Sequence, residues 1–77
     1  MNDKEKKQKQ IKLLQQNLCS IRKIAGWTTQ QLGEKIGLTK QTISNLENNK
    51  TPMTLTQYIA IRAVLDFEMQ TNPNKEY

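Results

Sequence analysis

Polar side chains that can donate and accept hydrogen bonds gather in the middle of the chain. Lys40 and Gln41 are followed one helical turn later by Ser44 and Asn45, and residues three or four apart share one face of an α-helix. Ammonium, amide and hydroxyl groups placed in this way suit recognition of a polar partner. Catalysis is not indicated, because the sequence has no histidine, no glycine-rich phosphate loop and no paired carboxylates in a plausible pocket. We therefore expect a binding protein and not an enzyme.

Two short helices joined by a tight turn must position this polar face. Thr28 is a good N-cap and Gln31 follows it by three residues, which is the spacing of a capping box. Gly37 ends the first helix, because glycine takes a left-handed conformation without a Cβ penalty. Thr39 then caps the second helix. The sequence thus predicts a helix-turn-helix over residues 29–48. Its inward-facing apolar positions are Leu32, Ile36, Ile43 and Leu46.

Helical periodicity is also present on both sides of this unit. Apolar residues recur at spacings of three and four from Ile11 to Ile21, and Gly26 ends that pattern. Thr54 and Gln57 repeat the capping-box spacing ahead of a further apolar pattern. Aromatic residues make up only 5% of the chain, and the apolar residues are mostly Ile and Leu. We predict an all-α fold, a small four- to five-helix bundle.

The ends of the chain differ from its middle. Residues 1–10 form a polar, basic extension, which is either a solvated continuation of the first helix or a disordered arm that makes phosphate contacts. Residues 11–70 form the predicted domain, and residues 71–77 are expected to be a flexible tail. No run of 18 apolar residues and no signal-peptide core occurs. We expect a cytoplasmic protein without a membrane partner.

Charge and cysteine content narrow the class of partner. Residues 1–62 hold eleven Lys or Arg and four acidic residues, whereas residues 63–77 hold one Lys and three acidic residues. A basic body fits an anionic partner, although lysine also serves simply to solubilise a small protein. Cys19 is the single cysteine, so a disulfide within the chain is excluded and a Cys/His zinc site has too few ligands. We expect no metal and no cofactor.

The central stretch resembles the helix-turn-helix of the phage-repressor and Cro-type (XRE-like) family of DNA-binding regulators. The similarity extends from about Leu14 to about Leu65. It implies a lambda-repressor-like DNA-binding domain with double-stranded DNA as its partner, and an ion pair between Arg22 and Glu47. The residues that carry the match are Gly26-Trp27-Thr28, Leu32, Gly37-Leu38-Thr39, Gln41-Thr42-Ile43-Ser44 and Leu46-Glu47.

The resemblance also implies a role for each polar position. The helix over residues 40–48 would enter the major groove, where short polar side chains reach base edges. Thr29 stands where the family usually has a phosphate-binding glutamine, and Asn49 stands where it usually has a left-handed glycine. The predicted base-reading residues are Lys40, Gln41, Ser44 and Asn45. The predicted phosphate-binding residues are Thr29, Gln30, Thr39, Thr42, Asn48 and Lys50.

Two functions follow from these patterns. The first is a sequence-specific transcriptional regulator, specifically a repressor, that binds a palindromic operator as a homodimer. The alternative is a protein-interaction module, such as an antitoxin that also binds DNA or a small regulator with a larger protein partner. The alternative is suggested by the last helix, where apolar residues occupy more than one face.

Overall fold

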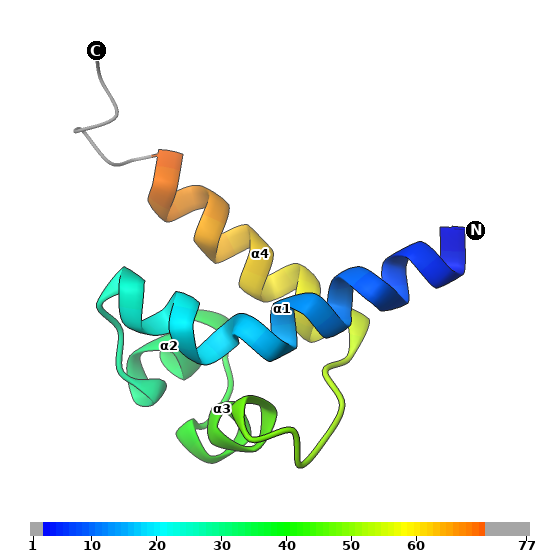
Figure 1. Ribbon diagram of the computed structural model, residues 1–77. Helices are drawn as coiled ribbons and strands as arrows, with labels where there is room; N and C mark the ends of the chain where they lie inside the picture. The colour runs from blue at the N-terminus through cyan, green and yellow to red at the C-terminus, as the bar shows by residue number, and fades with distance from the viewer. Residues whose placement is uncertain (1–2, 71–77) are drawn as a thin grey trace.

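The computed structural model describes residues 3–70, and the tail expected at 71–77 lies outside this part of the chain (Figure 1). Within the described residues the fold is all-α, which confirms the predicted class. It has four helices, where four or five were predicted. The helices are α1 (Asp3–Ala25), α2 (Thr29–Ile36), α3 (Lys40–Glu47) and α4 (Leu55–Gln70).

One apolar core lies between the four helices. α3 packs against both α1 and α2, and α4 also contacts α1 and α2. Leu18, Leu32 and Leu46 are at most 1% exposed, so α1, α2 and α3 each place a leucine at the centre. Partly buried side chains, including Trp27 and Tyr58, close the edges of this core. The full set of buried core residues is Ile11, Leu14, Leu18, Leu32, Ile43, Leu46, Met53 and Ile61.

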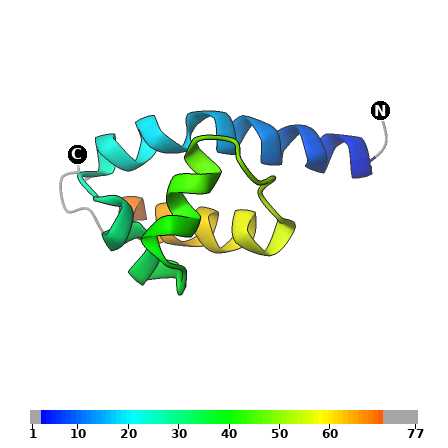
Figure 2. The same cartoon turned by 90° about the horizontal axis from the view of Figure 1, so that it is seen from below.

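The start of α1 resolves the two alternatives for the N-terminal extension. Residues 3–10 continue the helix, and all of them are exposed. Burial begins only at Ile11, which is 7% exposed. Figures 1 and 2 show that these first turns project beyond the other helices. Residues 3–10 therefore form a solvated helical projection rather than an arm.

The start of α4 follows the expected capping chemistry. The Thr54 backbone N–H donates to Gln57 Oε1 at 3.0 Å, and the Gln57 N–H donates to Thr54 Oγ1 at 3.1 Å. Met53 precedes this cap and is 5% exposed. Within residues 3–70, no helix has both the length and the apolar character needed to cross a bilayer.

Candidate nucleic-acid interface

The turn between α2 and α3 is built from contacts local in sequence. α2 begins with a complete capping box, in which the Gln31 N–H donates to Thr28 Oγ1 at 3.0 Å and the Thr28 N–H donates to Gln31 Oε1 at 2.8 Å. Gly37 ends α2 with φ of 77°, a left-handed conformation that favours glycine. The Leu38 N–H then donates to the Gly33 carbonyl at 2.8 Å. These bonds fix the direction in which α3 leaves the turn.

α3 is capped at its start and anchored on its inner face. Thr39 accepts a hydrogen bond from the Thr42 N–H at 3.2 Å, and the two hydroxyls lie 3.0 Å apart. Ile43 and Leu46 have no exposed surface. The opposite face is more open to solvent, whereas the side chain of Glu47 at the end of α3 is buried against Arg22.

The four predicted base-reading residues share this outer face. Lys40 and Gln41 are exposed, whereas Ser44 and Asn45 are half-buried. Gln41 Nε2 donates to Asn45 Oδ1 at 3.1 Å, and Asn48 Nδ2 donates to Ser44 Oγ at 3.3 Å. These bonds arrange the amides and the hydroxyl as two pairs along the outer face.

The predicted phosphate-binding residues fall into three pairs, which lie at the start of α2, at the cap of α3 and after α3. At the start of α2, Thr29 is half-buried, and the exposed Gln30 donates to Glu34 Oε2 at 3.2 Å. After α3, Asn48 and Lys50 are both exposed. The remaining two, Thr39 and Thr42, belong to the cap of α3, so their hydroxyls already have hydrogen-bond partners.

The backbone after α3 turns through a left-handed residue. Asn49 has φ of 58°, the conformation that asparagine tolerates best after glycine. The Asn49 N–H donates to the Leu46 carbonyl at 3.2 Å, and the Lys50 N–H donates to the Asn45 carbonyl at 2.8 Å. The helix therefore ends in a tight turn that exposes Lys50 beside the outer face.

The structure contains the ion pair that the resemblance implies between α1 and the end of α3. Arg22 Nε lies 2.5 Å from Glu47 Oε2, and Arg22 Nη2 lies 3.1 Å from Glu47 Oε1. The two side chains are only 11% and 8% exposed. Arg22 also donates to the Trp27 carbonyl at 2.8 Å. The hydrogen bonds to Glu47 raise the pKa of Arg22 above its ordinary value, so the guanidinium stays charged.

Comparison with known proteins now identifies the family. A family model described as helix-turn-helix matches residues 20–71, which include the end of α1 and all of α2, α3 and α4. The chain belongs to the helix-turn-helix family.

Two relatives carry the name Antitoxin HipB. The one from Escherichia coli strain K12 is 43% identical over 49 residues, which are 64% of this chain and 56% of the relative. The one from Escherichia coli O6:H1 is 41% identical over 49 residues, covering 64% of this chain and 52% of the relative. The chain thus spans about half the length of these curated relatives. No solved structure matches it at a significant level.

The helix-turn-helix also depends on Gln15, a residue that sequence reasoning passed over. This α1 side chain is 7% exposed. Its Nε2 donates to the Leu46 carbonyl at 3.0 Å and to the Thr51 carbonyl at 2.8 Å, and its Oε1 accepts from the Met53 N–H at 2.9 Å. One amide therefore satisfies three backbone groups and holds the segment after α3 against α1. Its only signal in the sequence is a polar residue beside the apolar positions of a helix.

Gly33 is the second residue that sequence reasoning missed. It is buried in the middle of α2, and its carbonyl accepts the N–H groups that end the helix. A Cβ at this position would lie 2.4 Å from the Leu38 carbonyl oxygen, so a side chain would push the turn away from α2. An isolated glycine inside a helical pattern is the signal that could have indicated this close approach.

Proposed function

We propose that this helix-turn-helix protein is a sequence-specific DNA-binding regulator of transcription, and specifically a repressor. The observation that carries the proposal is the outer face of α3, where Lys40, Gln41, Ser44 and Asn45 form a polar row on a helix anchored at both ends. We infer that the protein acts by binding and not by catalysis, and that it works in the cytoplasm.

The chemistry of the row suits the major groove of DNA. A glutamine amide pairs with adenine through one donor and one acceptor, and a lysine donates to guanine O6 and N7. In this proposal Gln41 and Lys40 take these roles. The free N–H groups at the start of α2, next to Thr29, face a phosphate, because helix N-termini favour anions. Asn48 and Lys50 contact the phosphates on the other side of the groove.

A homodimer on a palindromic operator is part of the proposal. One domain of this size buries too little surface for tight specific binding, whereas two copies reading equivalent half-sites double the contacts. The half-sites would lie one helical turn apart, about 34–36 Å.

Selection of bound fragments from a random DNA pool tests the function. The experiment is run at low salt and near physiological salt, with the wild-type protein and with Gln41→Ala. We expect a palindromic motif that survives the higher salt, and a relaxed preference at one base pair for the variant, worth about 1–3 kcal/mol. Binding that is independent of sequence and lost at higher salt would contradict specific recognition. Uniform weakening on all sequences would make Gln41 a backbone contact.

A second candidate function is that of an antitoxin, and the similarity to two proteins named Antitoxin HipB favours it. In this case the chain would bind a protein partner as well as DNA. α4 leaves apolar side chains available for such a partner, since Leu55 is 48% exposed and Ile59 is 57% exposed. Coexpression with the product of the adjacent gene tests it: rescue of growth together with copurification would support the antitoxin role, and neither result would be expected of a dedicated repressor.

A further inference from the structure

We propose that the first turns of α1 form a second phosphate-binding surface, which follows the DNA backbone beyond the half-site read by α3. The surface consists of Lys4, Gln8 and Lys12 together with the groove between α1 and the segment after α3. This inference rests on the proposed DNA-binding function and extends it, because the sequence predicted phosphate contacts at residues 29–50 and, for residues 1–10, only as a disordered arm and not as a helix.

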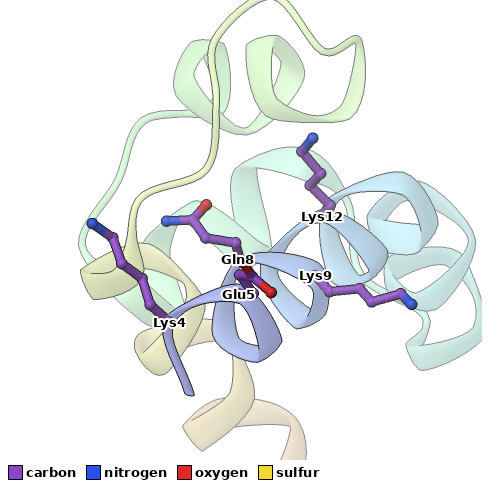
Figure 3. Close-up of a pocket in the computed structure, with 5 residues that line it drawn as sticks. All are labelled: Lys4, Glu5, Gln8, Lys9 and Lys12. Carbon is purple, nitrogen blue, oxygen red and sulfur yellow. The ribbon is translucent and has the colours of Figure 1, made fainter. Parts of the chain in front are cut away.

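The three side chains lie on one strip of α1. They are spaced four residues apart, so each is about 6 Å further along the helix axis than the last. All three are exposed, and they line a shallow groove together with Glu5 and Lys9. Figure 3 shows Lys4, Gln8 and Lys12 directed to the same side of the helix, with Lys9 directed to the other. Two ammonium groups and an amide between them thus form a row of hydrogen-bond donors.

This row continues into the predicted DNA-contacting loop. Lys12 also lines a second groove of about 340 Å³, whose other walls include Gln16 of α1 and, across from it, Asn49 and Thr51. Lys50 lies between these last two residues and is exposed. Lys12 therefore lies where the strip of Lys4, Gln8 and Lys12 on α1 meets the segment that follows α3.

Gln15 fixes the spacing between these two elements. Its bonds to Thr51 and Met53 hold the segment against α1, and Gln15 itself lines the second groove. A phosphate backbone that leaves Asn48 and Lys50 would pass next to Lys12 without a change in protein structure.

The charge of the projection indicates what covers it. Residues 3–12 contain five lysines and two acidic residues, and both acids lie in the first turn of α1, where the helix dipole favours carboxylates. Residues 3–10 are exposed along their whole length, so apolar packing does not explain why the helix extends past the core. DNA presents about one negative charge per 1.7 Å, and continuity with the α3 interface favours it over an acidic protein.

The experiment compares two double variants in the same helix. Lys4→Gln/Lys12→Gln removes two charges from the proposed surface. Lys6→Gln/Lys7→Gln removes two charges from residues that line neither groove and serves as the matched control, because glutamine keeps a similar helix propensity. Affinity is measured by fluorescence anisotropy over a salt series, on the selected operator with short and with long flanking duplex.

The slope of log K against log salt is negative. We expect Lys4→Gln/Lys12→Gln to reduce its magnitude by about 1.8 on the long duplex, since each phosphate contact contributes about 0.9. The control should reduce the magnitude of the slope by less than half as much. On the short duplex the two double variants should have the same slope. Equal slopes for both variants on the long duplex would overturn the proposal. A wild-type affinity that does not depend on the length of the flanking duplex would also overturn it.

Two further outcomes separate this proposal from its premise. If the wild-type protein selects no DNA motif at all, the DNA-binding function fails and the second surface fails with it. If the wild type binds its operator specifically and only the flank effect is missing, the second surface alone is wrong. Capture on immobilised poly-glutamate that is lost in Lys4→Gln/Lys12→Gln, with unchanged DNA titrations, would assign the strip to an acidic protein and also overturn it.

Discussion

The two connections on either side of α3 reach defined conformations by different means. The turn before α3 is held by residues within a few positions of one another, through the left-handed Gly37, the Thr39 cap and the Leu38–Gly33 bond. The segment after α3 is held mainly from α1, by Gln15 and by the Arg22–Glu47 pair. The position of α3 is therefore fixed by local contacts at its start and by long-range contacts at its end.

The largest effect is expected at the long-range end. Glu47→Ala leaves the Arg22 guanidinium, which is 11% exposed, without its carboxylate, and removing one partner of a buried pair is costly. We expect a loss of about 3 kcal/mol in the free energy of unfolding, measured by urea denaturation. The control Glu34→Ala removes an exposed carboxylate on α2 and should change stability by less than about 0.5 kcal/mol. A loss below about 1 kcal/mol for Glu47→Ala would mean that the pair is not a main anchor.

The same pair predicts how stability responds to alkaline pH. Because folding raises the pKa of Arg22, its contribution is complete below the ordinary arginine pKa and is lost only as pH rises through the still higher folded value. The stability difference between wild type and Glu47→Ala should therefore stay constant from about pH 7 to pH 10. A difference that shrinks in this window would assign the effect to another titrating group.

A somewhat smaller effect is expected at Gln15. Gln15→Leu replaces the amide with an apolar side chain of similar size and leaves the Thr51 carbonyl and the Met53 N–H without their partner. We expect a loss of about 2 kcal/mol, since unsatisfied buried groups cost about 1–3 kcal/mol each and water can reach the exposed Thr51. Faster hydrogen exchange at the Met53 amide should accompany it. Gln16→Leu, an exposed neighbour, is the control, and an equal loss there would rule out the hydrogen bonds as the cause.

The local end should respond more weakly, and two alanine substitutions separate its components. Gly33→Ala gains helix propensity, but its Cβ meets the Leu38 carbonyl, so we expect a net loss of about 1.5 kcal/mol and NMR shift changes throughout α3. Gly37→Ala has open space around its Cβ and suffers only from φ of 77°, which costs about 1 kcal/mol. Its shift changes should stay within the turn; changes across α3 in Gly37→Ala would contradict this division.

The same contrast explains what the sequence could predict. The caps at Thr28, Thr39 and Thr54 and the left-handed Gly37 were predictable, because each depends on residues within a single turn of the chain. The all-α class followed from periodicity, and the family followed from the spacing of the central motif. Gln15 was not predictable, because its partners lie 31 to 38 residues away and a polar residue in a helix is usually on the surface.

Two other features needed the fold. The projection of α1 had two interpretations, since a polar, lysine-rich stretch is compatible with helix or with disorder. The role of Gly33 depends on how closely the turn approaches α2, which no local pattern specifies. The base-reading roles of the outer face of α3 stay a prediction.

The bond between Gln41 and Asn45 has a consequence for how a new operator preference could arise. Because Gln41 Nε2 donates to Asn45 Oδ1, a substitution at either position frees or reorients the amide at the other. The effects of changing the two positions should then be non-additive, as is usual for residues in contact. Under the proposed function, the two positions form one heritable unit of specificity, and mutational routes to a new target would depend on the order in which they change.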